Sequence, residues 1–398
     1  MTTRLYYSDS YLKEFSGDVV EQCYVDNQPA VILDRTAFYP TSGGQPFDTG
    51  TLGSALVLRV EEDSAGRLLH VLDSILPVGP TTGVITWERR LDHMQQHTGQ
   101  HILSQAFIRV AKAPTLSFHM GVETSTIDLE LANPSTSVMA EAEEMASNIV
   151  FEDRPVQVLN ANPEGLAALG VRKESQRSGD IRVIDVDGFD RSPCGGTHVR
   201  RTGEIGMIAI LDYERYKGGT RVEFVCGRRA LKTLRQDHEA LKNLGRLYCA
   251  QLSDLPRLAE KFLQDRSALT RENARLRDQA LEHEARELAL QAERTSDFLL
   301  VKKGFPEHSL DDLKILAQKV TAQSGHLVIL FSLQETAQAV VARSADLAGD
   351  CGTAVTTSTK RHGGKGGGRR ELAQAGAIPA PALDMWLQEV ESHFRNRP

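Results

Sequence analysis

The stretch His97-Thr-Gly-Gln-His101, together with Cys194-Gly-Gly-Thr-His198, decides how this 398-residue chain is organised. Each stretch holds two metal-capable side chains four positions apart. In a helix, residues i and i+4 lie on one face, so His97 and His101 can bind the same ion. The apolar spacing of Ile-Leu-Ser-Gln-Ala-Phe-Ile after His101 predicts that helix. The first stretch is therefore expected to supply half of a metal site.

The second stretch cannot form a regular helix, because Pro193, Gly195 and Gly196 interrupt it. It is expected to be a turn that presents Cys194 and His198. Three imidazoles and one thiolate form a plausible tetrahedral shell for one Zn²⁺ per chain. The alternative is two unrelated pairs explained by packing, since two histidines four apart are a weak pattern on their own.

A helical zinc protease needs His-Glu-x-x-His, in which the glutamate is the general base. Thr98 follows His97 here, so peptide hydrolysis is disfavoured.

Composition favours a multidomain protein of the cytoplasm. Apolar residues make up 40% and charged residues 25% of the chain, as in ordinary globular proteins. No apolar run approaches the ~20 residues of a membrane span, and no secretory segment is expected at the N-terminus. The 5 cysteines are widely spaced and odd in number, which disfavours a disulfide framework. With a net charge of −7, any nucleic-acid surface must be a local patch.

The expected fold class is α+β, divided into four regions. Short apolar runs punctuated by Gly, Pro, Asp and Asn predict a small β-barrel over 1–86. Region 87–229 mixes helices and strands and contains the metal residues, with Ser137 expected to cap a helix that runs to about 152. A helical linker is predicted over 230–295, and an α/β domain over 296–398.

Within the barrel region, Phe38-Tyr-Pro-Thr-Ser-Gly-Gly-Gln-Pro46 interrupts the strand pattern. Its glycines allow close backbone approach to a ligand, whereas the plainer interpretation is a hairpin connection.

The linker carries a seven-residue repeat of mostly apolar side chains, which predicts a coiled coil or a helical hairpin. Ser253 and Asp254 followed by Pro256 predict two helices in place of one rod. Such a stalk can form a homodimer or only space two domains. The repeat comprises Leu234, Leu241, Tyr248, Leu255, Phe262, Leu269, Leu276, His283 and Leu290.

Near the C-terminus a glycine-rich basic stretch is expected to be a loop, followed by a helix that begins near Glu371. Exposed amides and cations suit a sugar–phosphate backbone, although a solvated loop has the same composition. The expected tRNA-binding residues are Lys360, Arg361, Gly363, Gly364, Lys365, Gly366, Gly367, Gly368, Arg369 and Arg370.

These motifs, in this order, resemble the editing and C-terminal regions of alanyl-tRNA synthetase. His97-x3-His101 with Ser192-Pro-Cys-Gly-Gly-Thr-His198 is similar to the editing domain, and Arg361-His-Gly-Gly-Lys-Gly-Gly-Gly-Arg369 to the Gly-rich element of a DHHA1-type tRNA-binding domain. The length leaves no room for an aminoacylation core, so the likeness is to the long-form freestanding editing proteins (AlaX-L).

The resemblance implies hydrolysis in trans of Ser-tRNA(Ala), with Gly-tRNA(Ala) as a second substrate. It assigns substrate binding to Thr41, Ser42, Gly43, Gly44 and Gln45, with Thr41 reading the serine hydroxyl. A pocket for alanine cannot strongly exclude serine, whereas a second site that hydrogen-bonds the hydroxyl rejects alanine.

The resemblance also implies that His97, His101, Cys194 and His198 hold the zinc, or that three hold it while one yields to water or substrate. His119 stands where related synthetases tend to carry a glutamine, so water activation by His119 is a hypothesis beside that of a packed histidine. A non-catalytic, zinc-containing RNA-binding protein remains the alternative. A phosphoesterase is disfavoured, because Asp92-His93-Met94 is not an Asp-His-His motif.

Overall fold

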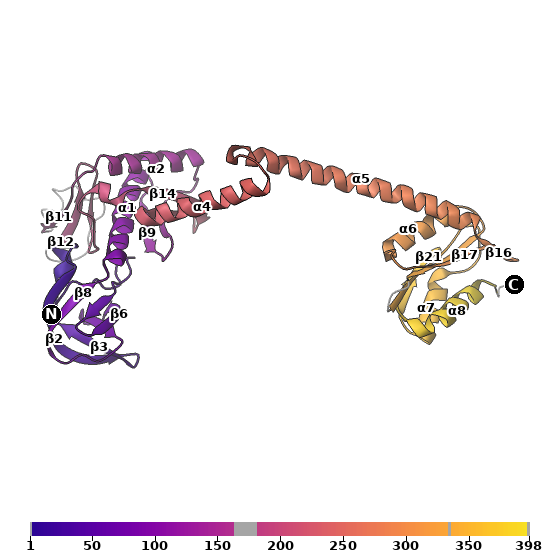
Figure 1. Cartoon of the computed structure of the whole chain (residues 1–398), viewed down its shortest axis with the longest axis horizontal. Coiled ribbons are helices and arrows are strands. Elements are labelled where there is room, and N and C mark those ends of the chain that lie inside the picture. The colour runs from indigo at the N-terminus through magenta and orange to yellow at the C-terminus, as the bar shows by residue number, and fades with distance from the viewer. Residues whose placement is uncertain (1, 163–180, 333–335, 396–398) are drawn as a thin grey trace. The chain divides into compact units, whose positions relative to one another are not determined.

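The computed structural model describes residues 2–162, 181–332 and 336–395 (Figure 1). The chain divides into two compact units, Met1–Leu252 and Ser253–Pro398, each of which is considered by itself. Among the described residues, no helix combines the length and the apolar character that crossing a bilayer requires.

A closed barrel with strand order β2-β3-β7-β6-β5-β8 forms the start of the first unit, as the short apolar runs predict. Alternating side chains such as Val19, Val31 and Leu33 fill its interior. Asp26 and Asn27 both have positive φ, which suits the two-residue turn between β2 and β3. The strands are β2 (Glu14–Val25), β3 (Gln28–Leu33), β5 (Gly50–Leu52), β6 (Ala55–Glu62), β7 (Leu68–Leu72) and β8 (Gly79–Ile85), beside a short parallel pair, β1 (Thr3–Arg4) and β4 (Arg35–Thr36).

Helix α1 (Trp87–Ala111) follows the barrel and is buried along most of its length, although its middle is polar. Hydrogen bonds satisfy that polarity; Gln96, for example, donates to the Cys226 carbonyl and accepts from the Cys226 N–H. Gly99 allows close packing, since a Cβ there would lie 2.3 Å from the Cys226 sulfur. The helix that carries His97 and His101 is therefore held rigidly against a sheet.

That sheet has the order β14-β15-β10-β9 and shares one apolar core with α1 and α2. Its strands are β9 (Thr115–Met120), β10 (Ser125–Leu129), β14 (Ile208–Tyr216) and β15 (Gly219–Cys226). Helix α2 (Thr136–Phe151) is capped by Ser135, whose hydroxyl accepts from the Val138 N–H. The expected cap at Ser137 is wrong, because Ser137 already lies in the first turn of the helix.

A second sheet of three strands, with order β11-β12-β13, leads to the cysteine turn. It consists of β11 (Val156–Ala161), β12 (Ile181–Val186) and β13 (Asp190–Pro193), and Cys194 comes directly after it. A 3₁₀ turn, Thr202–Ile205, follows before β14.

The linker region forms two helices, as the sequence predicts: α4 (Gly227–Leu247) in the first unit and α5 (Leu255–Leu290) in the second. Most of the seven-residue repeat is exposed; Leu234 is 55% and Leu269 68% exposed. The C-terminal half of α5 packs on its own unit through Leu281, Ala285 and Leu288.

The second unit is a six-stranded sheet with order β16-β17-β18-β19-β21-β20. Helix α6 and the end of α5 cover one face, and α7 and α8 cover the other (Figure 1). The elements are β16 (Glu293–Arg294), β17 (Leu299–Phe305), α6 (Leu310–Thr321), β18 (His326–Ser332), β19 (Thr336–Arg343), α7 (Cys351–His362), β20 (Lys365–Gly368), β21 (Leu372–Pro379) and α8 (Leu383–Arg395).

Two expectations about this unit are wrong. No helix begins near Glu371; residues 372–379 form β21, in which Ala373 and Ala375 alternate toward the core and pair with β19. The basic glycine stretch is also not a loop throughout, since it ends helix α7 and then forms the edge strand β20. Pairing across the sheet overrides the helix preference of the alanines.

Candidate metal site and glycine-rich turn

The four residues of the two opening motifs converge on one point. One ligand atom from each of His97, His101, Cys194 and His198 lies within 4.8 Å of all the others. The Cys194 sulfur is 3.4 Å from His97 Nε2 and 3.3 Å from His198 Nε2. All three histidines are buried. This cluster can hold a metal ion.

The second ring nitrogen, Nδ1, of each of these histidines also has a partner. Such outer partners set the tautomer and orientation of a ligand imidazole, so that it faces the metal through Nε2. The pairs are His97 with Gln45 Oε1 at 2.8 Å, His101 with Asp190 Oδ2 at 3.2 Å and His198 with Thr98 Oγ1 at 3.1 Å.

The electrostatics favour a thiolate at Cys194. Burial alone would raise the pKa of Cys194, but the neighbouring charges of His97 and His198 outweigh it and bring that pKa well below its usual value. Hydrogen bonds from His101 and His198 act in the same direction. A buried sulfur that ionises easily is a good ligand for a divalent metal.

The cysteine turn is shaped by its neighbours. Arg182 Nη1 donates to the carbonyl of Cys194 at 2.7 Å and to that of Gly196 at 2.9 Å. A Cβ at Gly196 would lie 2.2 Å from His97 Cε1, so only glycine lets the turn approach the helix this closely.

The glycine-rich segment forms a tight turn beside the cluster. Ser42 and Gln45 exchange both backbone hydrogen bonds at 3.0 Å, and Gly43 and Gly44 both have positive φ. These are the features of a type I′ turn. The Gly44 carbonyl accepts from the Met120 N–H at 3.0 Å, which fastens the turn to β9.

The two glycines of this turn are expected to differ sharply in their tolerance of alanine. At Gly44 a Cβ would lie 2.5 Å from the Phe118 carbonyl oxygen, whereas at Gly43 nothing lies within 4 Å. Gly43→Ala should cost only the left-handed backbone strain of about 1 kcal/mol, and Gly44→Ala several times more, because the turn must leave β9. Urea unfolding of both variants measures this difference; equal losses would contradict it.

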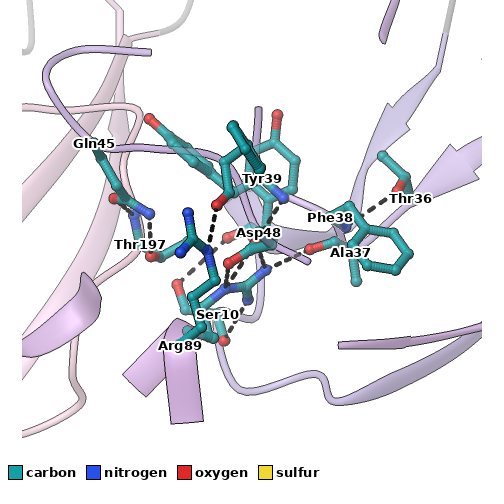
Figure 2. Close-up of polar contacts among 12 residues, drawn as sticks. Ser10, Thr36, Ala37, Phe38, Tyr39, Gln45, Asp48, Arg89 and Thr197 are labelled. Atoms are coloured by element: carbon teal, nitrogen blue, oxygen red, sulfur yellow. Dashed lines mark hydrogen bonds and ion pairs between the residues drawn. The ribbon is translucent and has the colours of Figure 1, made fainter. Parts of the chain in front are cut away.

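The base of this segment is tied to α1 by a buried ion pair. Arg90 Nε lies 3.1 Å from Asp48, and its Nη1 donates to the Ser10 carbonyl at 2.8 Å. Asp48 also accepts from the Tyr39 N–H at 2.7 Å. Figure 2 shows these contacts around Asp48, with Gln45 beside Thr197. The segment is thus held at both ends against the helix that carries the histidines.

The remaining predicted site residues are placed differently from one another. Thr41 and Ser42 are exposed at the turn, with the Thr41 N–H bonded to the Val60 carbonyl. Gln45 is fully buried and its side chain bonds protein groups. His119 is exposed, and its register partner on the neighbouring strand β10 is Thr126. Side chains alternate along a strand, so His119 lies on the face of β9 opposite to Phe118, whose ring packs against His97. His119 therefore does not lie on the face of β9 that packs against the His97 cluster.

In the second unit, the basic stretch runs from the end of helix α7 through the edge strand β20 to Arg370. Arg361 pairs with Glu389 at 2.7 Å, and Arg370 Nε donates to the Gly349 carbonyl. The ion pairs found among the described residues do not include Lys360, Lys365 or Arg369, which are exposed. These cations remain available to a ligand.

The glycines of this stretch have a packing role. A Cβ at Gly366 would lie 2.7 Å from Val355 Cγ1, and one at Gly368 would lie 2.4 Å from Ala373 Cα. Gly363 and Gly364 have positive φ. Glycine therefore lets β20 pack closely on β21 and α7.

Sequence reasoning missed the outer partners Asp190 and Thr98 and the role of Arg182. Thr98 follows His97 directly and Asp190 lies four residues before Cys194, but such proximity carries no signal until the two motifs meet in space.

Comparisons with known proteins find matches to an alanyl-tRNA editing protein and to alanine–tRNA ligases. The family described as "Threonyl and Alanyl tRNA synthetase second additional domain" matches residues 181–223, which include the cysteine turn. The alanyl-tRNA editing protein AlaX-L of Pyrococcus horikoshii is 27% identical over 412 aligned residues, covering 99% of this chain and 100% of that protein. The alanine–tRNA ligase of Pyrococcus furiosus is 30% identical over 387 residues, which cover 94% of this chain.

The chain spans only 42% of the length of that ligase. Among solved structures, the C-Ala domain of Aquifex aeolicus alanyl-tRNA synthetase is 21% identical, with 26% of this chain and 97% of that domain covered at a TM-score of 0.25. RecJ of Thermus thermophilus is 22% identical, with 33% of this chain and 20% of that chain covered at a TM-score of 0.26. By its sequence matches, the chain is similar along nearly its whole length to a long-form alanyl-tRNA editing protein and to the corresponding part of the alanine–tRNA ligases.

Proposed function

We propose that this protein is an aminoacyl-tRNA deacylase that hydrolyses Ser-tRNA(Ala), and also Gly-tRNA(Ala), in trans. The observation that carries the proposal is that the His97–Cys194–His198 cluster lies directly against the glycine-rich turn, through the contact of His97 with Gln45. The candidate metal site thus lies next to a turn with exposed hydroxyl groups. The match to AlaX-L along the whole chain supports this substrate class.

The metal of this proposal is zinc. Zn–S bonds of about 2.3 Å and Zn–N bonds of about 2.0–2.1 Å at the tetrahedral angle put a sulfur about 3.5 Å from a nitrogen. The distances of 3.4 and 3.3 Å from Cys194 fit that shell. When bound, zinc would supply positive charge beside the ester carbonyl or the terminal ribose. Four protein ligands close a zinc shell, so the role that we assign to this ion is positioning.

Thr41 is the proposed reader of the serine hydroxyl. It is exposed beside Ser42 in the turn, where its hydroxyl can bond a substrate hydroxyl. Alanine would leave that group unpaired, at a cost of about 1–3 kcal/mol.

The decisive test is deacylation of purified tRNA(Ala) charged separately with serine, glycine and alanine. We expect Ser-tRNA(Ala) to be hydrolysed about 10–100-fold faster than Ala-tRNA(Ala), because of the lost hydrogen bond. Thr41→Val, which keeps the shape but removes the hydroxyl, should reduce that ratio. Equal rates on serine and alanine esters would reject the proposed specificity. Binding of tRNA without turnover would favour the alternative, a non-catalytic RNA-binding protein.

The proposal assigns tRNA binding to the basic stretch that contains β20 and the residues beside it. Reversing both charges in Lys365→Glu with Arg369→Glu should weaken tRNA affinity by about 10–100-fold. The slope of log affinity against log salt should fall by the amount that corresponds to roughly two phosphate contacts. Filter binding at several salt concentrations measures both. The control is Lys303→Glu with Lys314→Glu, which changes the net charge of the same unit equally; a matching loss there would remove β20 from the interface.

We also propose that the protein forms a homodimer through the linker helices. The apolar side chains of the seven-residue repeat are mostly exposed in a single chain. Phe262, Leu269 and Leu276 are each at least half exposed on α5, and a dimer would bury them. Light scattering should give about twice the 43.8 kDa chain mass, since two copies are paired. Leu269→Glu with Leu276→Glu should give the single-chain mass; a wild-type monomer at micromolar concentration would contradict this part.

A further inference from the structure

We infer that Gln45 is a positioning residue that makes the position of the glycine-rich turn depend on the metal centre. The inference deepens the proposed function, on which it rests for the identity of the metal. It changes the role expected for Gln45, which the resemblance assigns to substrate binding.

The burial of Gln45 and its contacts with protein groups disfavour a direct contact of its side chain with a substrate. The residue is 0% exposed. Its Oε1 lies 2.8 Å from His97 Nδ1 and accepts from the Thr197 N–H at 3.1 Å. Its Nε2 donates to Thr197 Oγ1 at 2.9 Å. A side chain from the barrel thus bridges the histidine helix and the cysteine turn.

These contacts also determine the tautomer of His97. A backbone N–H can only donate, so the Gln45 atom that faces the Thr197 N–H must be the oxygen. The same oxygen faces His97 Nδ1, so Nδ1 must carry the proton and donate. In the neutral imidazole, which is the form that binds a metal, the lone pair of His97 is then on Nε2, the atom that lies 3.4 Å from the Cys194 sulfur. Gln45 therefore prepares His97 to bind a metal through Nε2.

The same residue fixes the turn. The backbone of Gln45 exchanges two hydrogen bonds with Ser42, so the turn that presents Thr41 and Ser42 moves with Gln45. Gly196 adds to the constraint, because a Cβ there would lie 3.0 Å from Gln45 Oε1. With His97 fixed by the ion, Gln45 is fixed, and the turn with it.

Two substitutions separate this role from plain packing. Gln45→Glu keeps an acceptor for His97, and its charge is offset by the net positive charge of a zinc–thiolate pair. Gln45→Met has a similar shape but cannot accept the His97 proton. A matched control is Gln96→Met, because Gln96 is also 0% exposed and its side chain also makes three hydrogen bonds, two with the backbone of Cys226 and one to Asp92.

The first experiment measures zinc affinity of the full-length variants by competition with a chromophoric chelator. Loss of an outer partner typically weakens metal binding by about 10–100-fold, which is the result expected for Gln45→Met. Gln45→Glu should stay close to wild type, and Gln96→Met should lose stability but not zinc affinity. Wild-type affinity in Gln45→Met, or equal weakening in the Glu and Met variants, would overturn the inference.

The second experiment measures backbone amide exchange in the peptide that spans residues 42–45, with and without zinc. Exchange there should slow on zinc binding in the wild type and should no longer respond in Gln45→Met, compared at saturating zinc. An unresponsive wild-type turn would overturn the coupling. Should Gln45→Met not fold, Thr197→Val removes only the Nε2 anchor and should weaken the same response; an unchanged response would overturn the coupling. Neither experiment uses tRNA, so failure of the deacylation assay and failure of this inference are distinguishable.

Discussion

Replacing Cys194 with alanine is expected to lower zinc affinity on the order of 10²–10³-fold, because structural zinc contributes about 10–16 kcal/mol shared among its ligands. The thiolate is also the only anion among the four ligand side chains, so its loss leaves three neutral imidazoles facing a dication. Metal content after dialysis against a chelator measures the effect.

Cys249→Ala is the matched control, since Cys249 is exposed and lies outside the cluster. It should retain one zinc per chain. A Cys194→Ala protein that also retains stoichiometric zinc after dialysis would show that the four residues are not the metal site. With zinc present, Cys194→Ala should unfold at a lower urea concentration than the wild type. Without zinc, the two proteins should unfold at similar urea concentrations, because the stabilisation comes from zinc binding to the folded state.

Replacing Arg90 with methionine is expected to destabilise the first unit by about 3–5 kcal/mol, because it leaves Asp48 as a buried charge without its partner. Both side chains are nearly inaccessible, at 0% and 1% exposure. Arg90 also satisfies the carbonyls of Ser10 and Ala37, so the substitution orphans these acceptors as well. Urea-induced unfolding, followed by fluorescence, measures the loss.

The control for Arg90 is Arg35→Met, which breaks the ion pair with Asp34. That arginine is 54% exposed, and exposed pairs contribute about 0–1 kcal/mol. Adding Asp48→Asn to Arg90→Met should restore part of the lost stability, because no buried charge remains. Equal losses at Arg90 and Arg35 would contradict the account of Asp48 as a buried carboxylate.

Local spacing explains which parts of the site could be predicted. His97 and His101 share a helix face because four residues span slightly more than one turn, and Pro193 with Gly195 excludes a helix at the cysteine. The type I′ turn also follows from Gly43 and Gly44, the residues that tolerate positive φ. For these features the sequence neighbours alone supply the physical constraint.

Local residue preferences gave wrong predictions for a helix near Glu371 and for the cap of α2. The alanines after Glu371 favour a helix in isolation, yet backbone pairing with β19 makes them a strand. Ser135, Thr136 and Ser137 offer consecutive hydroxyls, and only the observed start of α2 selects Ser135 as the cap. For β21 the choice was made by pairing with a distant segment.

The amino-acid sequence by itself determined the four residues of the candidate metal site, the closed barrel and the two linker helices, because periodicity, turn residues and ligand chemistry act over a few positions. Only the tertiary structure decided that Gln45, Asp190 and Thr98 complete the site and that His119 faces the other side of its strand. The roles of Gln45, Asp190 and Thr98 depend on hydrogen bonds between residues 52 to 152 positions apart. Such bonds form only after packing fixes the distances, and no local pattern encodes them.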